Sequence, residues 1–188
     1  MDAPPELLTS RTPKCEVELR RWRVVDADLC FRMVSESLEH LRPWMPWAAG
    51  DYERQDAVDY LQRCEAGWSD GSAFQYLILT EGTPAGSAGL MARIEPGGLE
   101  IGYWVHPAST GRGVAAAASA ALTDAAFALP GISHVEIHHD ALNVASGRVP
   151  AKLGYAHVDT RTARLDLAPG DSGTTKVWRI TPLDLYSL

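Results

Sequence analysis

The sequence has few cysteines and no long apolar run, and both shortages limit the class of protein. Its three cysteines, Cys15, Cys30 and Cys64, are widely spaced and form no CxxC pair, so we expect free thiols in a reducing compartment. No apolar run approaches the roughly 18 residues of a membrane-spanning helix. The first residues, MDAPPELLTS, lack the basic patch and apolar core of a signal peptide. We therefore expect a cytoplasmic protein.

Basic residues are also in deficit, with 17 Lys and Arg against 24 Asp and Glu and a formal net charge of -7. This balance disfavours nonspecific binding to nucleic acid or anionic lipid and is compatible with a cationic or amine substrate. The 188 residues, 46% of them hydrophobic, contain no linker or internal repeat. We predict a single domain over residues 1–188, with its core at about 16–180.

The hydrophobic pattern predicts a mixed α/β fold. Strands are expected at 15–22, 73–80, 87–94, 99–105, 133–139, from 155 onward and around 175–180. Helices are expected after Asp26 and at 52–68, 114–129 and 143–153. Only the turn sequences EGTPAG and EPGG separate the three strands between 73 and 105, which favours an antiparallel meander. The result is a mixed, mostly antiparallel sheet of about seven strands flanked by helices.

A glycine-rich turn lies between a strand and an alanine-rich helix in VHPASTGRGVAAAASAA, residues 105–121. The amides at such a helix N-terminus point in one direction, with the positive end of the helix dipole behind them. Glycine at 111 and 113 lets a diphosphate approach the backbone, and Arg112 adds a charged contact. The turn therefore predicts phosphate binding; simple packing of the helix against its sheet is the structural alternative.

Two other phosphate-binding motifs fit this turn less well. A Walker loop requires Lys and Ser or Thr after the second glycine, where this chain has Val and Ala, and is excluded. A dinucleotide-binding turn matches Gly111, Gly113 and Ala116 as GxGxxA, with Asp140 at about the distance of a ribose contact. That motif should open a series of parallel βαβ units, however, and here it follows an antiparallel meander.

The segment YWVHPASTGRGVAAAA resembles the acyl-CoA pyrophosphate loop of the GNAT acetyltransferases: Gln or Arg, two residues, Gly, one residue, then Gly or Ala. On that pattern Gly113 is the required glycine and Ala115 the final small residue. Asn143, Ser146 and the sequence LGY at 153–155 resemble the family's NxxS and LGF elements. The resemblance extends over about residues 16–180. The segments HLRPWMPWA and IGYWV are most similar to the RimJ and RimL type, which acetylates protein amino termini and related amines.

This resemblance implies an acetyl-CoA-dependent N-acetyltransferase of the GNAT fold that transfers acetyl directly to a primary amine, without a metal or a covalent intermediate. The implied acceptor is a protein or peptide α-amine, as in ribosomal proteins; a small-molecule amine or an antibiotic is the alternative. We expect no nucleic-acid or membrane partner, and the sequence leaves a homodimer open. The implied CoA-binding residues are Val105, Gly111, Arg112, Gly113, Val114, Ala115, Asn143 and Ser146.

The chain departs from the family pattern at two positions. Thr110 replaces the usual Gln or Arg and shortens one polar anchor of the phosphate loop. Pro150 stands where many members carry the tyrosine that returns a proton to the departing CoA sulfur, so that mechanism does not apply here. A proline inside a helix also removes the donor to the carbonyl of Ser146 and should kink or end the helix nearby. Both departures favour a rival function, a noncatalytic module that binds acyl-CoA as a sensor or interaction domain.

Two residues are predicted to be catalytic, Glu100 and Ser146. Glu100 shares a strand face with His106 and matches the position of a catalytic glutamate in several GNAT enzymes. It is our candidate base for an α-amine with a pKa of about 8; a rim carboxylate capping the EPGG turn is the alternative. By resemblance to RimL, Ser146 hydrogen-bonds the leaving thiolate, Asn143 holds the pantetheine arm or only caps its helix, and the amide near Val105 binds the oxyanion.

Tryptophans and histidines complete the candidate residues. Trp44 and Trp47 are predicted to line the acceptor cleft, with a plug of the core as the alternative, and Trp104 to bound the acyl pocket. The histidines of HVEIHH, residues 134–139, invite a metal hypothesis. Neighbouring strand residues point to opposite faces, and neither cysteine nor carboxylate stands at ligand spacing beside them, so we predict no metal site.

Overall fold

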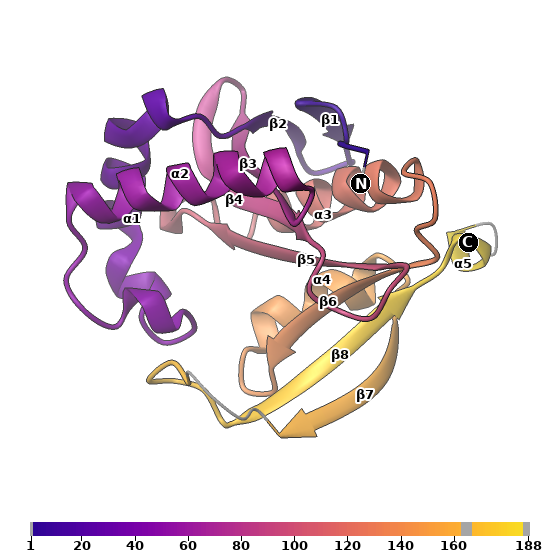
Figure 1. The fold of residues 1–188 in the computed structure, drawn as a ribbon. Helices are drawn as coiled ribbons and strands as arrows, with labels where there is room; N and C mark the ends of the chain where they lie inside the picture. Colours follow the sequence, from indigo (N-terminus) through magenta and orange to yellow (C-terminus); the bar gives the residue numbers. More distant parts are fainter. Residues whose placement is uncertain (1, 163–166, 186–188) are drawn as a thin grey trace.

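The computed structural model describes residues 2–162 and 167–185, which form one mixed sheet with helices on both faces (Figure 1). The strand order is β1-β2-β3-β4-β5-β6-β8-β7, and every neighbouring pair is antiparallel except β5 and β6. The strands are β1 (Leu7–Arg11), β2 (Glu16–Arg21), β3 (Ala73–Thr80), β4 (Thr83–Met91), β5 (Gly98–Val105), β6 (His134–Asp140), β7 (Ala156–Thr162) and β8 (Thr174–Ile180). The helices are α1 (Ala27–Leu41), α2 (Arg54–Asp70), α3 (Val114–Phe127), α4 (Val144–Lys152) and α5 (Pro182–Leu185), with short 3-10 helices η1 (Val24–Asp26), η2 (Pro46–Ala48) and η3 (Pro107–Ser109).

The predicted mixed, mostly antiparallel sheet is confirmed, with eight strands rather than about seven. The additional strand is β1, which pairs with β2 alone at one edge of the sheet. Its five residues, LLTSR, alternate only between exposed and half-buried positions, so they lack the strong apolar signal of a central strand. The sheet therefore begins before residue 16, where the predicted core starts.

β4 is displaced from its predicted position. It begins at Thr83, within the EGTPAG segment expected to be a turn, and ends at Met91 rather than near residue 94. The turn consists of Glu81 and Gly82, which both have positive φ angles, 50° and 73°. Pro84 is tolerated because it lies near the start of the strand, opposite a register shift in β3.

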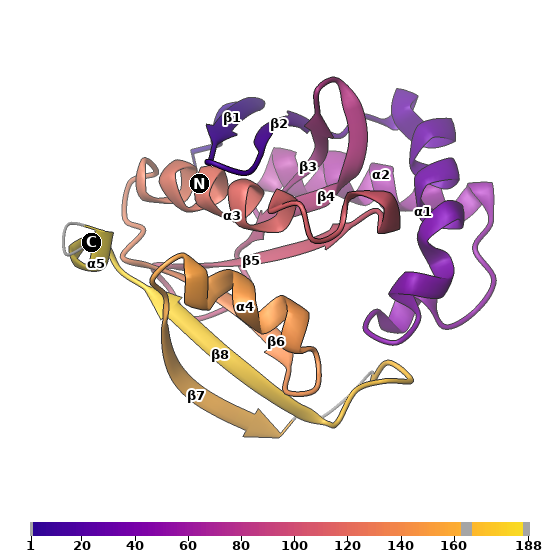
Figure 2. The same cartoon turned by 180° about the vertical axis from the view of Figure 1, so that it is seen from behind.

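Two hydrophobic clusters cover opposite faces of the sheet. One includes Leu99 of β5 together with Ala117 and Ala118 of α3, which are fully buried and let this helix approach the sheet closely. The other joins Trp22 and the partly buried Trp104 to α1 and α2. Figure 2 shows α3 and α4 together on the face opposite α2. Alternate residues of β5 thus point toward two different helical layers.

The sheet opens between β5 and β6. These strands pair in parallel only over a short stretch, from Gly98 opposite His134 to Ile101 opposite Ile137. Beyond it, β5 continues to Val105 and β6 to Asp140 without pairing with each other. They then separate toward the side of α1 (Figure 1). One parallel pair after an antiparallel meander is not the series of βαβ units that a dinucleotide fold requires. No helix in the described part of the chain is long and apolar enough to cross a membrane.

Candidate active site

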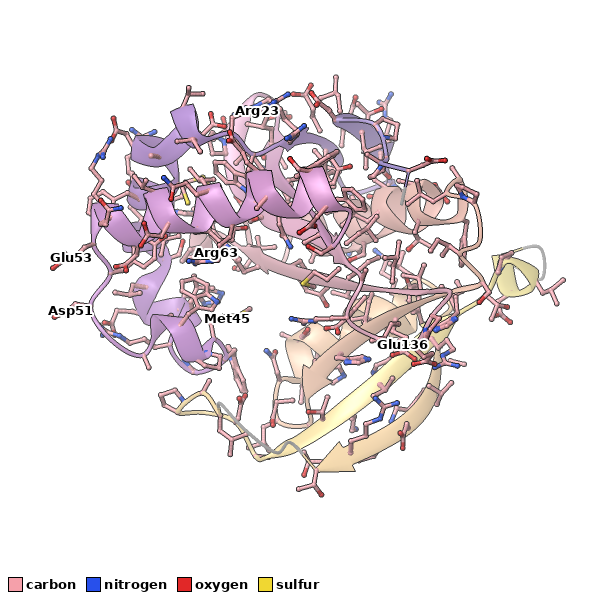
Figure 3. All side chains as sticks on the ribbon, viewed as in Figure 1. Arg23, Met45, Asp51, Glu53, Arg63 and Glu136 are labelled. Atoms are coloured by element: carbon pink, nitrogen blue, oxygen red, sulfur yellow. The ribbon has the colours of Figure 1, made fainter. Side chains whose placement is uncertain are left out.

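A cleft of about 550 Å³ lies where β5 and β6 separate. Tyr103 and Ser146 line it on the side of α3 and α4, and Trp104 and Met45 line it on the side of α1 and α2. In Figure 3, Met45 and Arg63 mark this second wall. The cleft therefore connects both faces of the sheet through the gap between the two strands.

The glycine-rich turn follows the end of β5 and leads into α3, and its residues Arg112 and Val114 line a second cavity of about 750 Å³ rather than the cleft itself. Gly111 and Gly113 have φ angles of 72° and 89°, and Gly113 is the N-cap of α3. A Cβ at residue 111 would meet no atom within 4 Å, so the left-handed backbone rather than lack of space requires glycine there. Among the described residues, none accepts a hydrogen bond from the amides of residues 111–115. These amides form a bare helix N-terminus suited to an anion.

The turn is fixed by its own side chains and by α1. The Thr110 hydroxyl donates to the carbonyl of Pro107 at 2.9 Å, so this residue contributes to the shape of the turn. The Nδ1 atom of His106 accepts from the amide of Ala108 at 3.3 Å, and its Nε2 lies 3.2 Å from a carboxylate oxygen of Glu36 on α1. Arg112 is exposed, which leaves its guanidinium accessible to an anion.

The free edge of β5 points its backbone into the cleft. The amide of His106 donates to the carbonyl of Ala85 on the β4 side at 2.8 Å. Successive strand residues direct their N–H and C=O groups to opposite neighbours, so the amide and carbonyl of Val105 face the side of β6. Because β6 no longer pairs there, these groups are available to a molecule lying in the gap.

The start of α4 forms the opposite edge of the gap. Asn143 caps this helix, with its Oδ1 accepting from the amide of Ser146 at 3.1 Å; the capping role is confirmed, and its side-chain NH₂ group is left for other contacts. The Ser146 hydroxyl lies 3.0 Å from that of Tyr103. The helix ends at Lys152, two residues after Pro150, as the proline predicts.

Glu100 lies in the cleft and is 5% exposed. Arg93 donates to both of its carboxylate oxygens, from Nε at 2.8 Å and from Nη2 at 2.5 Å, and this hydrogen-bonded pairing raises the pKa of Arg93. The Nδ1 atom of His138 lies 3.5 Å from the same carboxylate. Among the described residues, no amide of the EPGG turn donates to the Glu100 side chain. Each carboxylate oxygen retains a lone pair for an amine or a water molecule.

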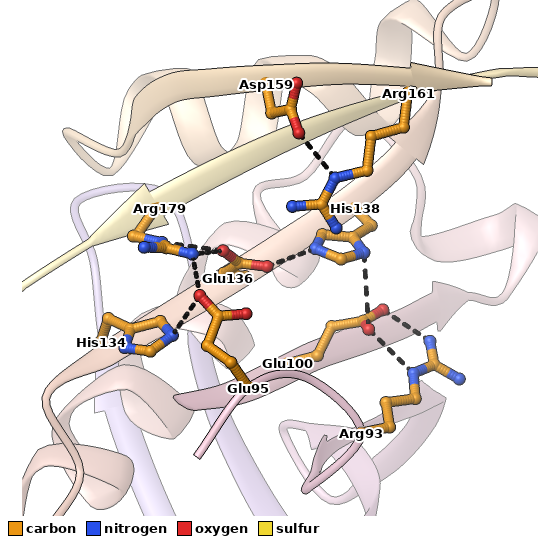
Figure 4. A network of polar contacts seen from close by, with 9 residues as sticks. All are labelled: Arg93, Glu95, Glu100, His134, Glu136, His138, Asp159, Arg161 and Arg179. Carbon is orange, nitrogen blue, oxygen red and sulfur yellow. Dashed lines mark hydrogen bonds and ion pairs between the residues drawn. The ribbon is translucent and has the colours of Figure 1, made fainter. Parts of the chain in front are cut away.

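A chain of charged side chains continues behind Glu100 (Figure 4). The Nε2 atom of His138 lies 2.6 Å from Glu136, which also accepts from Arg179 at 2.8 Å. Ligand atoms of Glu95, His134 and Glu136 lie within 4.8 Å of one another. The guanidinium of Arg179 donates to both of these carboxylates, so an arginine supplies the positive charge at this cluster.

The three predicted tryptophans, Trp44, Trp47 and Trp104, all line the cleft. Trp47 is 47% exposed, and its ring centroid lies 6.1 Å from that of Tyr52. Tyr52 and Tyr60 of the α2 region line the cleft as well, although no sequence motif marks them. The wall on this side is therefore largely aromatic, which suits a ligand with apolar groups.

Carboxylates outnumber guanidinium groups in the cleft. The carboxylates are those of Asp51, Asp56, Asp59, Glu100, Asp140 and Asp171, and the guanidinium groups are those of Arg63 and Arg93. This excess favours a positively charged ligand on the side of α1 and α2.

Sequence reasoning also missed Arg93, Tyr103 and His138. The two-residue strand period correctly assigns Tyr103 to the face opposite Glu100, but it cannot show that its hydroxyl meets α4. Arg93 lies in the turn after β4, where the strand period does not predict the direction of a side chain. His138 was considered in the sequence as a possible metal ligand, and the pairing of β5 with β6 reveals its contact with Glu100.

Comparisons with known proteins agree with this geometry. The family model described as an acetyltransferase (GNAT) domain matches residues 16–156. Mycobacterium smegmatis RimJ in complex with CoA-disulfide is similar in structure, with a TM-score of 0.86 and 24% identity over 98% of this chain and 92% of that one. RimL, a ribosomal L7/L12 α-N-protein acetyltransferase in complex with coenzyme A, is also similar. Its TM-score is 0.81 and its sequence identity 19%, over 92% of this chain and 97% of that one.

A third similar structure is the microcin C7 self-immunity acetyltransferase MccE in complex with acetyl-CoA and AMP. Its TM-score is 0.80 and its identity 16%, over 92% of this chain and 98% of that one. The search of curated protein sequences finds no match. At these identities the structures show a shared fold, whereas the family model covers most of the chain. The chain belongs to the acetyltransferase (GNAT) domain family.

Proposed function

We propose that this protein is an acetyl-CoA-dependent N-acetyltransferase that acts in the cytoplasm on the α-amine of a protein or peptide. The observation that carries the proposal is the set of bare amides at residues 111–115, which lie at the head of α3 shortly after the end of β5. A diphosphate is the ligand that such amides suit, and an extended thioester arm fits the gap. The CoA-bound structures of RimJ and RimL have the same fold.

The donor side uses mainly backbone groups. The amides of Gly111, Gly113 and Val114, with the Arg112 guanidinium, bind the diphosphate, and Ala115 is small enough to let it approach. The Val105 amide faces the gap and is the donor for the developing oxyanion. On the opposite edge, the Asn143 side chain binds the pantetheine arm, and the Ser146 hydroxyl donates a hydrogen bond to the departing thiolate.

The acceptor side uses side chains. Glu100 accepts the proton of the amine, directly or through one water molecule, while Arg93 and His138 hold its carboxylate in place. The surrounding carboxylates attract the ammonium form of the acceptor. Trp44 and Trp47 bind the groups next to the amine.

Acetyl transfer is direct. Cys30 also lines the cleft, but burial raises the pKa of its thiol to about 11. A protonated thiol is a weak nucleophile, so an acetyl-cysteine intermediate is disfavoured. Cys15, Cys30 and Cys64 are all free thiols, as the sequence predicts.

Two acceptor classes remain as alternatives. The likeness to RimL, which acts on ribosomal L7/L12, supports a protein N-terminus. The likeness to MccE, a self-immunity acetyltransferase bound to acetyl-CoA and AMP, supports a small amine. The open acidic mouth of the cleft favours the first class because a peptide can enter it with its charged end foremost.

Thiol release from acetyl-CoA tests the proposal. Peptides with the N-terminal sequences of ribosomal proteins and a panel of small amines are each assayed with and without enzyme, and calorimetry measures CoA binding separately. We expect release with at least one peptide that exceeds release with every small amine. CoA binding without turnover would identify a sensor module instead, and neither binding nor turnover would refute the assignment of the phosphate loop.

A further inference from the structure

The carbonyl of Ser146 has an unusual partner. In a regular helix it would accept from the amide of residue 150, but Pro150 has no N–H. The hydroxyl of Tyr103, from β5, donates to this carbonyl at 3.1 Å and lies 3.0 Å from the hydroxyl of the same serine. One phenol oxygen therefore contacts both the backbone and the side chain of Ser146.

The surroundings of Tyr103 make it a hydrogen-bond donor. It lines the cleft and packs against the cluster beneath α3. Burial raises the pKa of its hydroxyl to about 12, so the phenol keeps its proton at neutral pH. Among the described residues, Tyr103 is the only partner of the Ser146 hydroxyl. Tyr155, whose hydroxyl pairs with that of Thr123, is a buried tyrosine that does not line the cleft.

The pair has two arrangements of its hydrogens. When Tyr103 donates to the carbonyl of Ser146, the serine hydroxyl donates back to the phenol oxygen. When Tyr103 instead donates to the serine oxygen, the serine hydrogen is free to point into the cleft. The second arrangement leaves the tyrosine fixed to α4 while the serine donates to another atom. Both arrangements keep every proton on its own oxygen.

We propose that Tyr103 is a positioning residue for Ser146: in one arrangement its hydroxyl replaces the helical donor that Pro150 lacks, and in the other it donates to the serine oxygen and directs the serine hydroxyl toward the thiolate leaving group. This inference rests on the proposed function, since it assigns the sulfur of the acyl donor as the partner of Ser146. It adds a residue on β5 to the leaving-group side of the site. The stabilised species is a hydrogen-bonded thiolate, so no net proton transfer from tyrosine is required.

The variants Tyr103→Phe and Pro150→Ala distinguish two roles of Tyr103: orienting the Ser146 hydroxyl and stabilising α4. Tyr103→Phe should lower kcat about tenfold and the melting temperature by about 3 °C, with CoA affinity changed less than about twofold. Pro150→Ala restores an amide donor to the Ser146 carbonyl. The double variant should therefore recover the melting temperature but not kcat. Recovery of both would show that Tyr103 only supports the helix, and would overturn the proposal.

Ser146→Ala tests whether the tyrosine acts through the serine. Tyr103→Phe should lower kcat no further once the serine hydroxyl is absent, because both changes remove the same hydrogen bond. Two independent, additive losses would overturn the proposal. Tyr155→Phe is the matched control: it removes a buried phenol oxygen paired with Thr123 and should lower stability without lowering kcat.

Failure of this inference is distinguishable from failure of the proposed function. If the wild-type protein releases no thiol with any acceptor, the enzymatic assignment is wrong, and the role of Tyr103 toward a leaving thiolate is refuted with it. The hydrogen bond to the Ser146 carbonyl still predicts the loss of stability in Tyr103→Phe and its recovery with Pro150→Ala. If the wild-type protein is active and Tyr103→Phe leaves kcat unchanged, only the inference about Tyr103 is refuted.

Discussion

The two sides of the cleft are built differently. The side of α3 and α4 offers backbone groups: the bare amides of residues 111–115, the free edge at Val105 and the capped start of α4. The side of α1 and α2 offers charged and aromatic side chains held by other side chains, as Arg93 and His138 hold Glu100. A backbone site suits a ligand that stays constant, whereas a side-chain site can be altered one residue at a time. We therefore expect mutations on the two sides to affect different kinetic constants.

The largest effect is expected at Glu100. Glu100→Gln removes the proposed base but keeps the size of the side chain, so kcat should fall by about 10²–10³-fold while CoA affinity stays within about twofold. Initial rates across pH and calorimetry with CoA measure the two quantities. Glu95→Gln, a nearby exposed carboxylate outside the main cleft, is the control and should retain activity. Unchanged turnover of Glu100→Gln at every pH would rule out its role as a base.

A change on the backbone side should instead weaken CoA binding. Gly111→Ala forces alanine into a left-handed conformation, which costs about 1–2 kcal/mol of stability, and should weaken CoA binding about tenfold. Gly131→Ala is closely matched, because both glycines have positive φ angles, 72° and 81°, and neither Cβ would meet an atom within 4 Å. Both variants should melt earlier, and only Gly111→Ala should lose CoA affinity. Equal affinities would argue against a diphosphate at this turn.

A smaller effect is expected on the aromatic wall. Trp47→Ala should raise the KM for the acceptor about fivefold and leave the KM for acetyl-CoA unchanged, because Trp47 lines the cleft at the proposed acceptor side. Val25→Ala, at a valine that is 91% exposed, provides a comparison away from the cleft. An equal rise in both KM values would contradict the division of the cleft into two sides.

The smallest effect is a pH dependence of stability at His139. Burial lowers the pKa of this histidine below its ordinary 6.5, with Lys176 and His157 adding to the shift and Asp140 opposing it. The unfolded chain therefore binds the proton more readily, so this contribution to stability is complete above pH 6.5 and is lost as pH falls toward the folded-state pKa. Trp178 donates to the imidazole Nε2 at 2.9 Å, which requires the neutral ring.

Denaturant unfolding at several pH values between 5 and 8 checks this sign. The difference in unfolding free energy between the wild type and His139→Gln should shrink as the pH is lowered, since glutamine does not titrate in this range. A difference that is constant with pH would show that His139 makes no such contribution. Acetyl transfer at pH 7.5 should change less than in the Glu100 variant.

The backbone side of the site could largely be predicted from the sequence, and the side-chain side only in part. Gly111, Gly113 and Asn143 act through backbone conformation and local capping, which depend on neighbours in the chain. Glu100 depends on Arg93 and His138, and their contacts exist only after β4, β5 and β6 have paired. β1 escaped prediction because an edge strand of five half-exposed residues carries little hydrophobic signal. The position of Pro150 inside a helix predicts that the carbonyl of Ser146 lacks its helical donor. It does not predict that the hydroxyl of Tyr103 takes the donor's place.

The gap between β5 and β6 also has a consequence for the traffic of molecules through the protein. Because residues from both faces of the sheet line the cleft, the proposed thioester and the proposed amine can enter it from opposite faces. An acceptor bound at one face then leaves the other face open for exchange of the thioester carrier.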